Sequence, residues 1–369
     1  MPAVSIIIPS YNHERFIEEC IQSVLNQTFQ DFEIIITDDA STDHTVDIIE
    51  QFQDPRIRIF RHFKNKGASV TANHCITQSS GKYIAMLSSD DAWHPNKLET
   101  QVDYLEKHPE IGAVFGKVDW VDEAGRHLLS SRLPYMDAFN VSNRDRFEWL
   151  RHFFYRGNCL CHPCSLVRRE CYDEIGLLNP AFANLPDFDF WIRLCLRYDI
   201  HILDQKLTRF RKMQNETNAS GDTTTSRVRN RFEHFQILNH FLQLKNPNEF
   251  LRVFPESARY GQVTPSTIPF ILGQMAIEKG SDFSVLWGLN LIYNELQNPT
   301  TAKMLEQEFN FTYRDFIVSS GKCDPFKVSD FFPLLPASQV LQKNTLQMFL
   351  QASKDYARAI KLIIARLLT

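Results

Sequence analysis

A chain of 369 residues is long enough for one large domain or two moderate ones, and 43% hydrophobic with 23% charged residues is an ordinary globular composition. A net charge of −4 gives no overall attraction to nucleic acid, so we expect no nucleic-acid partner. No apolar run reaches membrane-spanning length, and the first residues lead straight into a strand without a basic leader region. These features predict a cytoplasmic protein.

The eight cysteines predict buried free thiols in a reducing compartment. One group, Cys159, Cys161, His162, Cys164 and Cys171, offers enough soft ligands for zinc. It lacks paired CxxC knuckles at a regular separation, so zinc is the less favoured interpretation. We expect these thiols to lie in the core beside the active site.

The first 87 residues alternate between strands and helices. Short apolar runs predict strands at 4–8, 32–37, 57–60 and 83–87. Helices are predicted from an N-cap at Asn12 to about Gln27, after a cap at Ser41 or Thr42, and over 69–80. Pro9 is expected to end the first strand. Strands that alternate with helices predict an α/β fold with a mostly parallel sheet covered by helices on both faces.

A polar cluster follows each predicted strand, at residues 10–12, 38–42, 64–67 and 88–91. In parallel sheets ligands bind outside the carboxyl ends of the strands, so the four clusters should face one crevice. A nucleotide is the natural occupant. The sequence has no GxGxxG turn after its first strand and no P-loop, which argues against a dinucleotide oxidoreductase and a conventional kinase.

Asp90 and Asp91 end the fourth predicted strand side by side. Adjacent carboxylates repel each other and are costly to desolvate, which predicts a cation or firm hydrogen-bond donors nearby. Oxygen ligands suit Mg²⁺ or Mn²⁺, which accompany diphosphates. Taken alone, the pair could also be a solvated turn that caps a helix.

Five segments, in this order and spacing, resemble the family 2 glycosyltransferases, which are inverting enzymes of the GT-A type. They are VSIIIPSYN (4–12), SVLNQTFQDFEIIITDDASTD (23–43), NKGAS (65–69), GKYIAMLSSDDAWHPNKL (81–98) and PDFDFWIRL (186–194). The resemblance fades after about Ser220. We therefore predict a GT-A domain over 1–225, with a Rossmann-like, mostly parallel sheet, and a helical C-terminal extension over 226–369.

The resemblance implies a nucleotide site and a metal site. Asp39, with Asp38 beside it, would hydrogen-bond the base, commonly uracil, while Tyr11 packs on the ring of the base. Asp90 would face the ribose, and Asp91 would bind Mn²⁺ or Mg²⁺ at the diphosphate. The implied nucleotide-binding residues are Pro9, Tyr11, Asn12, Asp38, Asp39, Asn65, Gly67 and Asp90.

The resemblance also implies that Asp187 is the general base that deprotonates an acceptor hydroxyl. Asp189 is its local rival, and either aspartate could instead complement the helix dipole. His162 could line the acceptor pocket, and Arg211 could contact the diphosphate. The candidate acceptor or diphosphate contacts are Trp93, His162, Asp189, Trp191 and Arg211.

The implied function is transfer of a sugar from a nucleotide-linked donor, UDP- or dTDP-linked, to a hydroxyl of a glycan or lipid-linked acceptor. Such reactions serve polysaccharide and cell-envelope biosynthesis. Three departures from the family pattern are Ser88 for an aspartate, Ala72 for an arginine and Met213 for a histidine. They motivate the alternative of a catalytically inactive, sugar-nucleotide-binding subunit of a glycan-assembly complex.

The last third of the chain is not covered by the resemblance. Helical periodicity predicts helices over 227–244, 268–279, 283–297, 302–319 and 338–368. The last of these mixes basic and apolar residues, so it could lie on the inner face of a membrane or bind a protein partner. A helix that packs on its own domain is the favoured interpretation.

Overall fold

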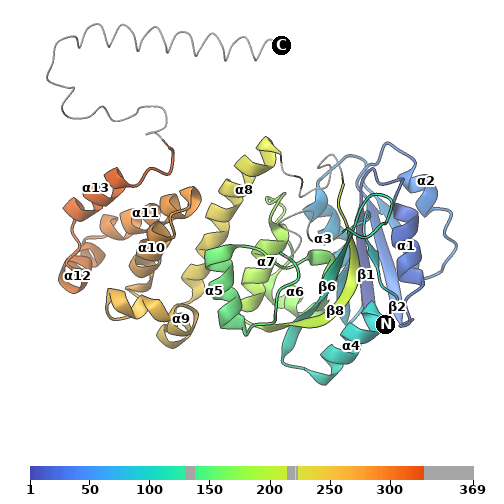
Figure 1. Cartoon of the computed structure of the whole chain (residues 1–369), viewed down its shortest axis with the longest axis horizontal. Coiled ribbons are helices and arrows are strands. Elements are labelled where there is room, and N and C mark those ends of the chain that lie inside the picture. Colours follow the sequence, from blue (N-terminus) through green and yellow to red (C-terminus); the bar gives the residue numbers. More distant parts are fainter. Residues whose placement is uncertain (129–137, 214–220, 222, 328–369) are drawn as a thin grey trace, which may run out of the picture. The chain divides into compact units, whose positions relative to one another are not determined.

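The computed structural model describes residues 1–128, 138–213, 221 and 223–327 of the chain (Figure 1). Residues Met1–Ser320 form one compact unit, and Gly321–Thr369 form a second. The site, the sheet and most helices belong to the first unit. The predicted final helix at 338–368, with its candidate membrane or partner role, lies outside the described residues.

An eight-stranded mixed sheet organises the first unit, with strand order β3-β2-β1-β4-β7-β6-β8-β5. The strands are β1 (Val4–Ser10), β2 (Phe32–Asp38), β3 (Ile57–Arg61), β4 (Tyr83–Met86), β5 (Ala92–Trp93), β6 (Ile111–Val121), β7 (Ser165–Arg168) and β8 (Asp199–Arg211). The four predicted strands are confirmed and pair in parallel. β5, β6 and β8 were not predicted, and neither was the antiparallel direction of β7, so the sheet is mixed beyond β4.

Helices cover both faces of the sheet, as predicted for this α/β class (Figure 1). One face packs against α1 and α4, and the other packs against α3, α5 and α7. The covering helices are α1 (Ile17–Leu25), α2 (Thr45–Ile49), α3 (Ala68–Gln78), α4 (Lys97–Lys107), α5 (Arg146–Arg156), α6 (Arg169–Ile175) and α7 (Pro186–Cys195). Alternate side chains of β1 enter both cores, which explains its continuous run of isoleucines.

Three local predictions in the first 50 residues were wrong. Pro9 lies inside β1, because the pairing of β1 with β4 ends at Ile7 and no β4 residue pairs with Pro9. Asn12 does not cap α1, which follows Phe16, because Asn12 adopts a φ of 52° and its side chain binds Thr42 instead. The second helix begins at Thr45 rather than directly after Ser41 or Thr42.

The region after residue 225 is helical, as predicted. Its elements are α8 (Thr224–Ile237), η3 (Leu238–Gln243), α9 (Pro247–Val253), η4 (Pro255–Tyr260), α10 (Ile268–Lys279), α11 (Asp282–Gln297), α12 (Pro299–Phe309) and α13 (Tyr313–Lys322). The helix predicted over 302–319 is divided at Asn310, which adopts the left-handed conformation. α9 and η4 were not predicted. Among the described helices, none is both long and apolar enough to cross a membrane.

One apolar core joins this helical region to the sheet. Phe154 of α5 packs edge-on against Phe241 and Phe254, and the same cluster continues to Ile271 and Trp287. The cysteines of this core and its surroundings are free thiols, as predicted, and all but Cys323 are buried. The proposed domain boundary at 225/226 therefore crosses a continuous core, and its position stays a prediction.

Close packing of α10 against α11 depends on two glycines. A Cβ placed on Gly288 would lie 2.4 Å from the backbone oxygen of Gly273 and 3.0 Å from Ile277 Cγ1. Backbone cannot yield as a flexible side chain does, so Gly288→Ala should destabilise the fold by about 1–3 kcal/mol. Thermal unfolding measures this loss as a lowered Tm.

The matched control is Gly321→Ala in α13, where an added Cβ meets no atom within 4 Å. Alanine favours helix over glycine, so this variant should keep or slightly raise the Tm. An unchanged Tm in Gly288→Ala would contradict the close-packing account.

Candidate active site

A cavity of about 410 Å³ opens at the carboxyl ends of β1 and β4, where the polar clusters were expected to meet. The predicted residues that line it are Pro9, Tyr11, Asp39, Asn65, Gly67, Asp90, Asp91, His162 and Asp187. The predicted residues that do not line it are Asn12, Asp38, Trp93, Asp189, Trp191 and Arg211. The cavity thus joins the two predicted acidic motifs, although they lie about a hundred residues apart in the sequence.

The acid pair is held from behind by Arg211. The backbone N–H of Arg211 donates to Asp91 Oδ1 at 2.7 Å, and its Nε donates to the backbone oxygen of Asp90 at 2.8 Å. The remaining guanidinium nitrogens bind the carbonyls of Asp122 and Glu123 and the carboxylate of Glu19. Each guanidinium nitrogen therefore has a partner inside the protein, and Arg211 lies buried rather than in the cavity.

Asp91 carries an unfavourable charge in this position. Its burial, together with the neighbouring Asp90, raises the pKa of Asp91 well above its ordinary value. Within the described residues no group of three or more His, Cys, Asp or Glu side chains could hold a metal ion. Mg²⁺ in phosphate sites is commonly bound by one or two carboxylates plus substrate oxygens and water, so the Asp90–Asp91 donor set fits such an ion.

Asp39 anchors the loop that follows β3. Its carboxylate accepts hydrogen bonds from the backbone N–H groups of Lys66 and Gly67, at 2.9 and 2.8 Å, and from His62 Nδ1 at 2.8 Å. Gly67 has a φ of 91°, which favours glycine there. These bonds place Asn65 and Gly67 on the cavity wall, and they occupy much of the acceptor capacity that base recognition by Asp39 would use.

The loop after β1 presents Tyr11 at the cavity. Asn12 fixes this loop, because its side-chain oxygen accepts from the backbone N–H of Thr42 at 2.8 Å. Asp38 accepts from the backbone N–H of Ser41 at 2.9 Å, and Ser41 Oγ in turn accepts from the backbone N–H of Asn12 at 2.9 Å. Tyr11 is 43% exposed, so part of its side chain is accessible to a stacking partner. Asn12 and Asp38 thus support the wall of the cavity without lining it.

Asp187 lies in the first turn of α7 and lines the same cavity as the acid pair. Burial raises the pKa of Asp187 to about 6, although a hydrogen bond from Asn158 Nδ2 at 2.9 Å partly offsets the effect. The side-chain oxygen of Asn158 accepts from the Leu160 N–H at 3.0 Å, which orients its amide group toward Asp187. A carboxylate with this pKa is suited to proton abstraction near neutral pH.

Asp189, the alternative candidate for the base, is engaged in contacts that stabilise the fold. It is buried, and it pairs with Arg193 at 2.7 Å and with His240 Nε2 at 2.7 Å. The hydrogen bond from His240 and the charge of Arg193 outweigh burial and hold the pKa of Asp189 below its ordinary value. Asp189 therefore fastens α7 to η3 and does not reach the cavity.

Two aromatic residues that were predicted to contact the acceptor or the diphosphate do not line the cavity either. Trp93 is buried and donates from Nε1 to the backbone oxygen of Pro163 at 2.9 Å. Trp191 is fully buried and packs edge-on against the ring of His162, with centroids 5.2 Å apart. His162 itself lines the cavity. Burial lowers the pKa of His162 to about 3, so its imidazole is neutral and can donate or accept one hydrogen bond.

Two buried polar atoms beside the cavity lack a hydrogen-bond partner within the described part of the chain, namely Ser10 Oγ and His162 Nε2. Unpaired buried polar groups are rare in folded proteins, and a bound ligand is one way to satisfy them. Both residues line the cavity. Two hydrogen-bonding atoms of residues that line the cavity are therefore not used within the described part of the chain.

Sequence reasoning missed several residues of the site. His13 lines the cavity and its Nδ1 lies 2.7 Å from Ser89 Oγ, while Phe139 supplies part of the apolar wall. Glu233 of α8 is fully buried, and its carboxylate accepts from the backbone N–H groups of residues 183–185. This carboxylate fixes the turn directly before Asp187. Its long distance from that turn in the sequence left no local signal for the contact.

Comparison with known proteins adds to this geometry. A family model described as "Glycosyl transferase family 2" matches residues 5–176. An Escherichia coli protein, the UDP-Glc:alpha-D-GlcNAc-diphosphoundecaprenol beta-1,3-glucosyltransferase WfgD, is 36% identical over 239 residues, which are 59% of this chain and 85% of WfgD. The chain belongs to glycosyltransferase family 2. The predicted family is thereby confirmed.

A further relative and a solved structure are also similar to this chain. The putative glycosyltransferase EpsE of Bacillus subtilis is 42% identical over 201 residues, covering 52% of this chain and 66% of EpsE. The structure of S. aureus TarS residues 1–349 with UDP-GlcNAc has a TM-score of 0.54 and 19% identity, and covers 86% of this chain and 90% of that one. This likeness supports the fold, which is of the GT-A type.

The contact between Glu233 and the turn before Asp187 can be tested by Glu233→Gln. The amide of glutamine would place a donor against backbone N–H donors, and the loss of charge-assisted hydrogen bonds should cost about 1.5–3 kcal/mol. We expect a lowered Tm in thermal unfolding. Glu306→Gln, on the exposed face of α12, is the matched control and should leave the Tm unchanged. Equal Tm values for the two variants would contradict the role given to Glu233.

Proposed function

We propose that this family 2 protein is an inverting glycosyltransferase that moves a sugar from a UDP- or dTDP-linked donor to a hydroxyl of a glycan or lipid-linked acceptor. The observation that carries the proposal is the position of Asp187, whose raised pKa of about 6 accompanies a place in the same cavity as Asp90 and Asp91. One cavity thus offers both a candidate base and a candidate site for a diphosphate.

The donor half of the cavity has the chemistry that a nucleoside diphosphate requires. Tyr11 offers a partly exposed side chain for the base, and Asn65 and Gly67 stand beside it on the wall that Asp39 holds. Asp90 is the proposed ribose contact. Asp38 and Asn12 would act by positioning the Tyr11 loop, and Arg211 would act by positioning the acid pair.

Mn²⁺ or Mg²⁺ is the proposed cofactor, with Asp91 as its ligand and Asp90 beside it. Such an ion would supply charge neutralisation for the leaving diphosphate. The residues of the chain supply the positioning of the carboxylates. Asp91 is held in place by Arg211, and the partial burial of Asp187 disfavours its charged form.

The proposed reaction is a single displacement. Asp187 takes the proton of the acceptor hydroxyl, the oxygen forms a bond to the anomeric carbon, and the bond from that carbon to the diphosphate breaks. The nucleoside diphosphate leaves with the bonding electron pair, and attack from the opposite side inverts the anomeric configuration. Asn158 keeps the Asp187 carboxylate oriented toward the acceptor.

The acceptor class is proposed from chemistry and from a relative. His162 and Ser10 present unpaired polar atoms that can bind sugar hydroxyls. The name of the E. coli relative describes a UDP-glucose donor and a diphosphoundecaprenol-linked acceptor, which supports a UDP donor and a lipid-linked acceptor here. The chain spans only 36% and 48% of two longer relatives from Rickettsia felis and Rickettsia conorii. A role in polysaccharide or cell-envelope biosynthesis is part of the same proposal.

The role of Asp187 is tested by turnover of UDP-sugars across pH. For the wild type, kcat/KM should fall about tenfold per pH unit below about 6, because protonation of Asp187 removes the base. Asp187→Asn should lower kcat about 10²–10⁴-fold at pH 7.5. Released UDP and glycosylated product are measured together for each donor.

Thermal unfolding controls for misfolding of this variant. The pKa of Asp187 is higher in the folded chain than its ordinary 3.8, so its ionised form costs stability above about pH 6. Asp187→Asn removes that cost and should keep or raise the Tm at pH 7.5. A wild type that binds UDP but turns over no donor would favour the inactive-subunit alternative, and full activity in Asp187→Asn would refute the base assignment.

A further inference from the structure

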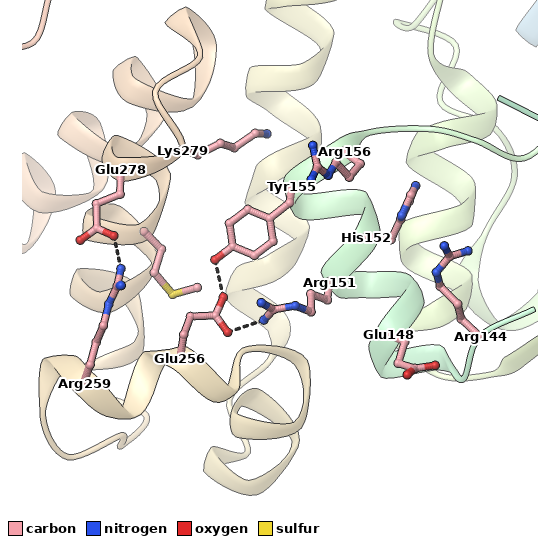
Figure 2. A pocket seen from close by; sticks show the side chains of 11 residues that line it. Arg144, Glu148, Arg151, His152, Tyr155, Arg156, Glu256, Arg259, Glu278 and Lys279 are labelled. Atoms are coloured by element: carbon pink, nitrogen blue, oxygen red, sulfur yellow. Dashed lines mark hydrogen bonds and ion pairs between the residues drawn. The ribbon is translucent and has the colours of Figure 1, made fainter. Parts of the chain in front are cut away.

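A second cavity, of about 720 Å³, lies between α5, η4 and the end of α10 (Figure 2). It shares no lining residue with the donor cavity. Five of its lining side chains are arginine or lysine, and three are glutamate. The balance between these charges decides what the cavity can bind.

The three glutamates already have partners within the fold. Glu256 accepts from Arg151 and Tyr155, and Glu278 pairs with Arg259, as Figure 2 shows. Glu148 accepts from the backbone N–H of Asp145 at 3.1 Å, as part of the capping box of α5. Glu256 and Glu278 are therefore paired with arginines, and among the described residues Glu148 has no cationic partner.

Three cations remain without a carboxylate partner in the part of the chain that the structure describes, namely Arg144, Arg156 and Lys279. The guanidinium of Arg144 donates to the carbonyl of Ser142 and lies over the ring of Trp149. In Figure 2, Lys279 extends from α10 toward the side of the cavity where Arg156 lies. Arg156 is exposed, so its charge is available to a ligand.

The ammonium of Lys279 is half-buried without a counter-ion. It lies 5.0 Å from the ring centroid of Phe283 and 5.6 Å from that of Phe154. Burial lowers the pKa of Lys279 to about 8. Aromatic rings compensate a buried cation only in part, so an anion that enters the cavity would recover the remaining electrostatic energy.

The same positive field acts on His152. Burial lowers the pKa of His152, and the charges of Arg144 and Arg156 lower it further. The neutral ring can still donate one hydrogen bond to an anion. The cavity therefore combines guanidinium, ammonium and imidazole donors, which is the donor set of phosphate sites.

We propose that this cavity binds a phosphate-bearing ligand through Arg144, Arg156 and Lys279. The site is separate from the donor cavity and does not depend on the proposed transferase activity. The phosphate could belong to a free soluble compound or to the head group of a lipid, since both present the same oxygens. The polar lining and the exposed Arg156 admit either source.

The test is calorimetric titration of the full chain with inorganic pyrophosphate, while saturating UDP blocks the donor cavity. The wild type should bind pyrophosphate, and the affinity should fall as salt is raised because the contacts are ionic. The double variant Arg156→Gln/Lys279→Gln should lose at least about tenfold in affinity, which corresponds to two charge-assisted contacts. UDP affinity should stay the same in this variant.

The matched control is the double variant Arg314→Gln/Lys303→Gln, which removes two charges from α12 and α13 outside the cavity. It should bind pyrophosphate like the wild type. Geranyl diphosphate in place of pyrophosphate separates the sources: tighter binding assigns the site to a lipid diphosphate, and equal binding assigns it to a soluble phosphate. No binding of either probe by the wild type, or equal loss in both double variants, would overturn the proposal.

Discussion

The contact between Arg211 and the acid pair is the constraint on which the site depends. Two adjacent carboxylates at a strand end cannot stay buried without compensation, since the desolvation of each charge costs several kcal/mol. Arg211 compensates through its backbone N–H to Asp91 and its guanidinium to the carbonyl of Asp90. The same guanidinium binds Glu19 of α1, so the end of β8, the β4–β5 turn and the first helix are held together.

The part of the cavity that carries Asp187 is fixed by residues from the helical region. Glu233 holds the turn before Asp187, and His240 holds Asp189 in the same first turn of α7. Residues 5–176 match the family model, but Asp187, the proposed base, lies beyond that match and is held by contacts from beyond residue 225. The C-terminal helices therefore help to position the residues of the cavity. The apolar core that runs through both regions also holds these helices against the sheet domain.

The local sequence pattern was enough to predict the strands and turns around Asp39, Asp90 and Asp91. The isoleucine runs of β1 and β2 and the acidic turn after β4 follow from side-chain period and strand-end chemistry. The role of Arg211 could not be predicted in this way, because its partners Glu19 and Asp91 lie 192 and 120 positions away. A sequence shows that an arginine suits phosphate, but only the fold shows that its nitrogens are already bound.

The antiparallel pairing of strands also could not be predicted from local sequence. β7 is only four residues long, and its direction is set by its place between β4 and β6 rather than by its residues. Asn12 favoured a cap by residue type, but the neighbouring loop at Thr42 offered a stronger partner. Glu233 gave no local signal at all. Contacts between distant segments therefore account for the part of the site that the sequence did not predict.

Calorimetric titration of UDP with and without Mn²⁺ tests the central claim most directly, because it measures whether the acid pair held by Arg211 couples a cation to the donor. Mn²⁺ should tighten UDP binding by the wild type at least about tenfold, through neutralisation of the carboxylates and the diphosphate. Asp91→Asn should lose that gain, whereas Asp187→Asn should keep it. Equal tightening of UDP binding by Mn²⁺ in wild type and Asp91→Asn would contradict the account.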